Sequence, residues 1–132
     1  MSALPELVRR PTAVDLFRFS AATWNAHRIH YDADHARQEG LPGVVVQAHL
    51  HGAYLAQVVL AFGGPRSRLV ELEWRNRRPA VAGETLRYGG TVERVTEDPQ
   101  ARRLQCTLEG RRSDGEVCVT GSATLMVPKD AA

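Results

Sequence analysis

Hydrophobic and polar residues change their spacing several times along the chain, and these changes divide it into segments. The run from Gln47 to Phe62, QAHLHGAYLAQVVLAF, is apolar on nearly every face of a helix and is followed by the helix-ending sequence Gly-Gly-Pro. A helix that is apolar on all sides belongs in the interior of a domain. We therefore predict one long, buried helix over this run.

Four segments after the helix alternate in the manner of strands. They are RLVELEWRNRRPA, ETLRYGGTVERV, RRLQCTLEGRR and EVCVTGSATLMV, and pairs of turn-forming residues at 82–83, 98–99 and 114–115 separate them. A two-residue turn at 114–115 sets the register of the last hairpin. In that register Leu104, Cys106, Leu108 and Gly110 lie opposite Leu125, Ala123, Gly121 and Val119, so one face of the hairpin is entirely apolar or glycine.

The segments before the long helix complete the plan. Residues 12–24, TAVDLFRFSAATW, are rich in aromatic and β-branched residues and alternate loosely, which favours a first strand. The sequence DADHARQEGLPG indicates a short helix with Asp32 as its N-cap and Gly40 near its end. Residues 1–12 and 128–132 resemble frayed ends. We predict an α+β fold in which five antiparallel strands wrap around the central helix.

Length and composition agree with one ordinary globular domain over residues 1–132. The chain is 43% hydrophobic and 24% charged, and its N-terminus lacks an apolar leader segment. No apolar run is long enough to span a bilayer, so we expect a cytoplasmic protein without a membrane partner. The two cysteines, Cys106 and Cys118, have no CxxC partner, which supports neither a zinc ribbon nor a disulfide framework.

Three arginines crowd into the sequence EWRNRRPA, although the net charge is only +2. Arg75, Arg77 and Arg78 are suited to binding the phosphates of a nucleotide-bearing substrate. A solvated strand edge is the alternative, because acidic residues are spread through the same segments. No recognised nucleic-acid motif is visible, and we expect no nucleic-acid partner.

The stretch WNAHRIHYD, residues 24–32, contains the densest set of proton-transferring groups in the chain. One interpretation is a metal site built on His27, His30 and Asp32, with His49 and His51 as a further pair, but no spacing matches a known zinc pattern and we expect no metal. Another is a polar turn after a strand. The third is a proton-transfer site, which we favour because a histidine beside a buried apolar helix is suited to acid–base work near neutral pH.

Three stretches of the sequence resemble the MaoC-like hydratases and dehydratases, which have the hotdog fold. FSAATWNAHRIHYD is similar to the family's hydratase motif, D-x-N-P-[IL]-H-x-D, with Asn25 at the aspartate, His27 at the asparagine and His30 at the histidine. Within the family, this stretch resembles the branch of type-2 3-hydroxyacyl-thioester dehydratases and mesaconyl-C4-CoA hydratases. LPGVVVQAHLHGAYLAQVV resembles the start of the central hotdog helix, with Gln47 at the family's histidine and Ala48 at its glycine, and RNRRPAVAGETLRYGGTV resembles the strand pair that follows.

The resemblance implies a hydro-lyase that adds water to an enoyl thioester of CoA or acyl carrier protein, without a cofactor. His30 is the expected base, and Asn25 is expected to hold the water or the 3-hydroxyl group. We expect His27, Gln47, Ala48 and His49 to bind the substrate, with the first N–H groups of the helix directed at the thioester carbonyl. Asn25 cannot donate a proton as a carboxylic acid does, so the donor to C2 is His30, a relayed water or His27.

Two other functions use the same fold. The chain can be a non-catalytic thioester-binding subunit that partners a second hotdog chain, or a thioesterase. The thioesterase is less favoured because the helix QAHLHGAYLAQVV carries no carboxylate to act as nucleophile or base. We also expect a homodimer, because one small curled sheet leaves an edge strand and one side of the helix uncovered.

Overall fold

The computed structural model describes residues 2–129 and contains ten secondary-structure elements. In chain order these are β1 (Ser2–Ala3), β2 (Leu7–Arg9), α1 (Ala13–Thr23), the short 3-10 helix η1 (Arg28–His30), α2 (Ala33–Gln38), α3 (Ala48–Gly63), β3 (Arg68–Asn76), β4 (Leu86–Glu97), β5 (Ala101–Arg111) and β6 (Val117–Pro128).

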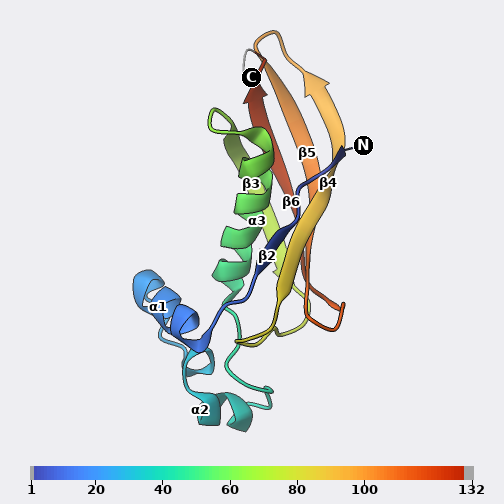
Figure 1. Cartoon of the computed structure of the whole chain (residues 1–132). Helices are drawn as coiled ribbons and strands as arrows, with labels where there is room; N and C mark the ends of the chain where they lie inside the picture. Colours follow the sequence, from blue (N-terminus) through green and yellow to red (C-terminus); the bar gives the residue numbers. More distant parts are fainter. Residues whose placement is uncertain (1, 130–132) are drawn as a thin grey trace.

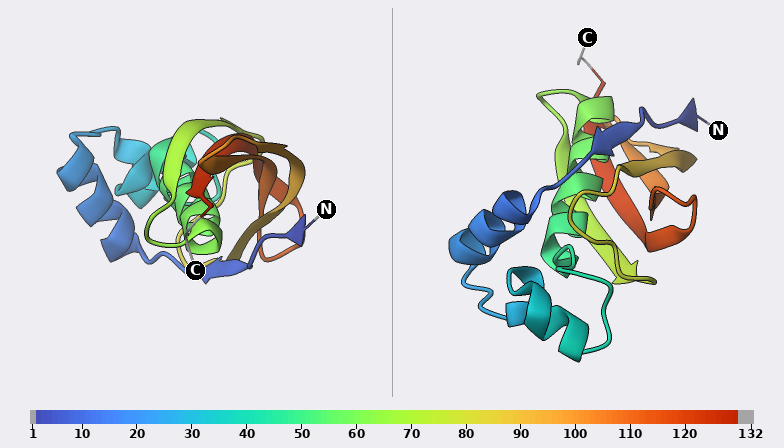
Figure 2. Two further views of the ribbon diagram at one scale, coloured as in Figure 1. Left: turned by 90° about the horizontal axis from the view of Figure 1, so that it is seen from above. Right: turned by 60° about the horizontal axis from the view of Figure 1, so that its bottom comes forward.

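A single antiparallel sheet curls around helix α3, as Figures 1 and 2 show. The strand order is β1-β4-β5-β6-β3, and β2 also pairs with β4. Helix α3 supplies the centre of the core through Leu55, Val58 and Val59, which are buried against the concave face of the sheet. This arrangement confirms the predicted α+β hotdog fold and the predicted central helix.

The last hairpin has the predicted register. Leu104 pairs with Leu125, Cys106 with Ala123 and Leu108 with Gly121, and Gly115 adopts the positive φ of 84° that the turn requires. The register shifts between Gly110 and Arg111. Beyond this shift Arg112 donates its backbone N–H to the Glu116 carbonyl, so the loop contains three residues, 113–115, and the predicted two-residue turn is one residue too short. Both cysteines are buried free thiols.

The strand predicted at residues 12–24 is wrong, because this segment forms helix α1. Thr12 caps the helix by accepting a hydrogen bond from the backbone N–H of Asp15, whose carboxylate accepts one from the N–H of Thr12 in return. Only Leu16 and Ser20, four residues apart, are buried, which is the spacing of one helix face. Of the aromatic residues that suggested a strand, Phe17 and Trp24 are exposed, and Phe19 is partly buried against the core.

The predicted number of strands and the predicted frayed N-terminus are also wrong. The sheet has six strands rather than five, and its first two lie within the segment that was expected to be frayed. Leu4, between them, is buried in the core. Hydrogen bonding to β4, together with this apolar anchor, orders the segment despite its short strands.

Helices α1 and α2 lie beyond one end of the sheet, close to the N-terminus of α3 (Figure 1). Helix α2 matches the prediction: the Asp32 side chain caps it by accepting from the N–H of His35, and Gly40 follows it with a φ of 84°. Within residues 2–129, no helix combines the length and the apolar content needed to cross a membrane.

Candidate active site

The dense polar stretch forms a turn that is organised largely by its own side chains. Asn25 Oδ1 accepts a hydrogen bond from the backbone N–H of His27 at 3.3 Å, and His27 Nδ1 accepts one from the N–H of Ile29, also at 3.3 Å. Such local bonds are typical of asparagine and histidine in turns. The interpretation of this stretch as a polar turn therefore accounts for part of the role of Asn25 and His27.

His30 differs from its neighbours because its ring is buried and bound to a distant segment. Its Nδ1 lies 2.7 Å from the carbonyl oxygen of Val45. A carbonyl can only accept, so Nδ1 carries the proton and Nε2 retains a free lone pair. Burial lowers the pKa of His30, and the nearby His27 lowers it further, while the Val45 carbonyl opposes both effects. His30 is therefore a neutral imidazole with a basic Nε2 at neutral pH.

A cavity of about 450 Å³ lies between this turn, the start of α3 and the end of β3. Its polar lining includes Asn25, His30, His49 and His51, with Arg77 and Arg78 on the strand side. The remaining wall is mostly apolar, from residues of η1, the segment before α3 and Pro79. The cavity thus combines an acid–base group with apolar walls of the kind that bind small organic ligands.

The start of α3 contributes backbone donors to this cavity. Ala48 and His49, both in the cavity wall, occupy the first turn of the helix, where N–H groups have no partner within the helix. Within residues 2–129 neither of these N–H groups donates a hydrogen bond. These donors, at the positive end of the helix dipole, are suited to stabilising negative charge on a bound oxygen.

Two of the six expected site residues do not line the cavity. Gln47 is fully buried, and its Nε2 donates to the carbonyl oxygen of Leu16 at 2.7 Å and to Ser20 Oγ at 2.9 Å. The Gln47 side chain therefore attaches α3 to α1. His27 lies beside the cavity, with its ring centroid 6.0 Å from that of His30. Asn25, His30, Ala48 and His49 are brought together as expected.

Sequence reasoning missed His51 as a site residue. It lies in the cavity wall, one helical turn after Ala48, and its exposed fraction is only 2%. The spacing i, i+3 from Ala48 places both residues on one face of α3 and was the available signal. Within residues 2–129 the acidic, histidine and cysteine side chains form no group that could hold a metal ion.

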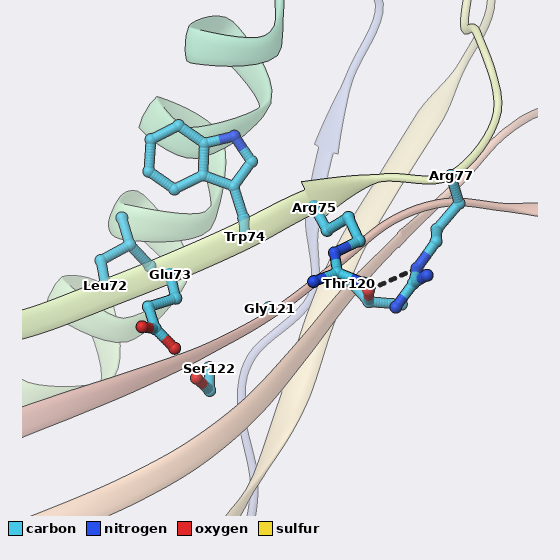
Figure 3. Close-up of a pocket in the computed structure, with 8 residues that line it drawn as sticks. All are labelled: Leu72, Glu73, Trp74, Arg75, Arg77, Thr120, Gly121 and Ser122. Carbon is cyan, nitrogen blue, oxygen red and sulfur yellow. Dashed lines mark hydrogen bonds between the residues drawn. The ribbon is translucent and has the colours of Figure 1, made fainter.

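A second and larger hollow, of about 740 Å³, lies over β3 and β6 (Figure 3). Arg75 and Arg77 both line it, and Arg77 Nε donates to Thr120 Oγ1 at 2.9 Å. Its lining contains no histidine or cysteine. We place the chemistry in the smaller cavity, because that cavity contains His30 and the helix N-terminus. Arg77 lines both hollows and so connects them.

Together, fold and site define a hotdog protein with a buried histidine at the N-terminus of its central helix. The sequence profile of the family "Hydroxyacyl-thioester dehydratase type 2" matches residues 5–82. The chain belongs to this family.

One relative and two solved structures illustrate the similarity. The chain is 54% identical over 113 residues to the mesaconyl-C4-CoA hydratase of Chloroflexus aurantiacus, a match that covers 83% of this chain and 36% of the relative. The chain thus spans about a third of the length of that curated relative. The (R)-hydratase of A. caviae involved in PHA biosynthesis superposes with a TM-score of 0.87 at 18% identity, over 97% of this chain and 98% of the other. The ChsH1–ChsH2 complex of Mycobacterium tuberculosis superposes with a TM-score of 0.86 at 22% identity, over 96% of this chain and 95% of the other.

Proposed function

We propose that the chain is a hydro-lyase that adds water reversibly across the C2=C3 bond of an enoyl thioester. The observation that carries this proposal is that His30, whose Nε2 has a free lone pair, lines the same cavity as Ala48 and His49, whose N–H groups have no partner within the helix. A base for water and donors for a developing oxyanion are the two elements that the reaction needs. The name of the relative from Chloroflexus, a hydratase of a CoA thioester, supports the same class.

In hydration, His30 Nε2 removes a proton from a water molecule, and the water oxygen bonds to C3. The π electrons of C2=C3 move toward the carbonyl, and the N–H groups of Ala48 and His49 stabilise the resulting enolate oxygen. The His30 imidazolium then returns the proton to C2. Asn25 orients the water through its amide, and dehydration runs through the same steps in reverse.

The test is to mix the purified protein with crotonyl-CoA and follow the loss of the conjugated enoyl absorbance. His30→Ala should lower kcat/KM by roughly 10²-fold or more, the usual scale for a positioned acid–base group. His35→Ala is the matched control, because His35 lies on α2 outside the cavity wall. A large loss in His27→Ala with His30→Ala unaffected would move the base to His27 instead.

A non-catalytic thioester-binding subunit is the second candidate. One observation favours it: Asn25 stands where the hydratase motif has a carboxylate, and its side chain binds the turn backbone. Crotonyl-CoA binding in a calorimeter without any loss of enoyl absorbance would select this function over the hydratase.

We propose that the thioester carrier is CoA. Its phosphates would lie near Arg75, at the end of β3, and near Arg77 and Arg78, just after this strand. Arg75 and Arg77 form no ion pair among the described residues, and Arg78 has only a long one, 3.6 Å from Glu116. Arg75→Ala combined with Arg77→Ala should raise KM for crotonyl-CoA but leave KM for the N-acetylcysteamine thioester, which lacks phosphates, unchanged. An equal change with both substrates would contradict this assignment.

We also propose that the chain assembles as a homodimer through β3. Within residues 2–129 this strand pairs with β6 only, so its other edge has backbone groups free for a partner, and Val70 on this strand is 45% exposed. The exposed Leu60 and Phe62 near the end of α3 are further apolar surface that a partner can cover.

A further inference from the structure

His51 is a buried polar residue that the proposed mechanism does not use. It sits in the second turn of α3, lines the cavity and has almost no solvent exposure. His30 is the other buried polar residue of this wall, whereas His49, Arg77 and Arg78 are exposed. His51 is therefore a polar group in the deep part of the cavity.

The Nδ1 atom of His51 is bound to the hydroxyl oxygen of Tyr88, a residue of β4, at 2.7 Å. Tyr88 is fully buried, and within residues 2–129 its hydroxyl has no other hydrogen-bond partner. If Nδ1 were the donor, the buried hydroxyl hydrogen would have no acceptor, which is unfavourable. The hydroxyl therefore donates to Nδ1, and the imidazole proton lies on Nε2.

Both groups stay neutral over the range in which the enzyme would work. Burial lowers the pKa of His51 to about 4 and raises the pKa of Tyr88 far above its usual range. Since Nδ1 accepts from Tyr88, a second proton on His51 would also break this bond. The Tyr88–His51 pair thus presents a neutral, oriented Nε2–H.

We propose that His51 donates this Nε2–H to an oxygen of the bound acyl group, and that Tyr88 acts as the positioning residue that fixes the tautomer. The inference rests on the proposed function, because it assumes that the acyl group occupies this cavity. An acyl oxygen is the suitable ligand, because an apolar chain packed over a buried donor would leave that donor unpaired. The oxygen belongs either to the thioester carbonyl or to a carboxylate further along the acyl group.

Two substrates distinguish these sources: crotonyl-CoA, whose acyl group carries only the carbonyl oxygen, and fumaryl-CoA, which adds a carboxylate. His51→Phe should lower kcat/KM by about tenfold or more, with both substrates if the carbonyl is bound and with fumaryl-CoA alone if the carboxylate is bound. His51→Gln, which keeps an N–H donor, should recover part of the loss. Unchanged kcat/KM in His51→Phe with both substrates would overturn the proposal.

The positioning role of Tyr88 has its own test and control. In ¹⁵N spectra of histidine-labelled protein, one imidazole should stay neutral at pH 5.5 with its proton on Nε2, and Tyr88→Phe should abolish this signature. Tyr54→Phe is the matched control, because the Tyr54 ring packs 5.1 Å from that of Tyr88 but has no hydrogen bond to His51. A proton on Nδ1 of His51 in the wild type would contradict the proposal.

The same spectra separate this inference from the hydratase proposal. Butyryl-CoA and succinyl-CoA, the saturated counterparts of the two substrates, bind without reacting at C2=C3. At least one of them should shift the His51 Nε2–H resonance even if the protein hydrates nothing. If both bind and neither shifts this resonance, the His51 inference fails while the hydratase proposal can still stand on turnover.

Discussion

At the residue scale, the two buried histidines of the cavity have opposite tautomers because their Nδ1 atoms have different partners. The Val45 carbonyl can only accept, so His30 carries its proton on Nδ1 and has a free lone pair on Nε2. The buried Tyr88 hydroxyl donates, so His51 has a lone pair on Nδ1 and a proton on Nε2. One imidazole is thereby suited to act as a base and the other as a hydrogen-bond donor.

The pH profile of kcat/KM should report the state of His30. The base must be neutral to accept a proton, and burial sets its pKa below the usual value of 6.5. The rate should therefore remain high as pH falls through 6.5 and decline only below the lowered pKa. The measurement is kcat/KM for crotonyl-CoA between pH 5 and 8; an acid limb centred above 6.5 would argue against His30 as the base.

Substitutions at Asn25 should have smaller effects than those at His30. Asn25→Ala removes one half-buried amide, whose hydrogen bonds are worth about 0.5–1.5 kcal/mol, and with it the bond to the His27 N–H. Asn25→Asp keeps an acceptor for that N–H and restores the family's carboxylate, so it should retain or raise hydration of some enoyl thioesters. Turnover of crotonyl-CoA by both variants checks this order, and a loss in Asn25→Ala equal to that in His30→Ala would contradict it.

At the scale of elements, α3 and the edge strand β3 are in close contact at Gly52. A Cβ atom added there would lie 2.5 Å from Cζ2 of Trp74, whose indole N–H donates to the Ala48 carbonyl at 2.9 Å. This close packing connects β3 to the first turn of the helix, and hence to the backbone donors of the site.

Gly52→Ala should therefore destabilise the protein although alanine is the better helix former. Its helix propensity favours folding by about 1 kcal/mol, whereas overpacking against the ring costs about 1–3 kcal/mol or more. We expect a net loss in the free energy of unfolding, measured by urea denaturation. Gly89→Ala, where an added Cβ meets nothing within 4 Å, is the control. A stabilised Gly52→Ala would show that Trp74 moves aside at little cost.

At the scale of the whole molecule, the free edge of β3 is the feature that a second copy would complete. Val70→Lys should place a charge on this exposed edge and convert the expected dimer to monomer at micromolar concentration, as measured by light scattering. Val14→Lys, on the exposed face of α1, is the matched control and should leave the dimer intact. A wild-type monomer, or dissociation caused by Val14→Lys alone, would contradict assembly through β3.

The sequence by itself determined the elements whose patterns are local. The apolar run of α3, the Asp32 cap of α2 and the register of the last hairpin over residues 104–110 were all predicted, because helix period, capping and strand alternation depend on neighbouring residues. The turn of that hairpin was placed correctly but is one residue longer than predicted. The resemblance to known motifs also predicted that His30 and the start of the central helix belong to one site, and both line the same cavity.

Only the tertiary structure decided which distant groups meet. Helix α1 was mistaken for a strand because its aromatic residues suggested a pleated surface, and its two buried positions become evident only when it packs beside α3. Gln47 faces α1 rather than the cavity, and the partner of His51 lies 37 residues away on β4. Periodicity states which face of an element is buried, but the tautomer and the role of a buried histidine depend on the partner that the fold brings to it.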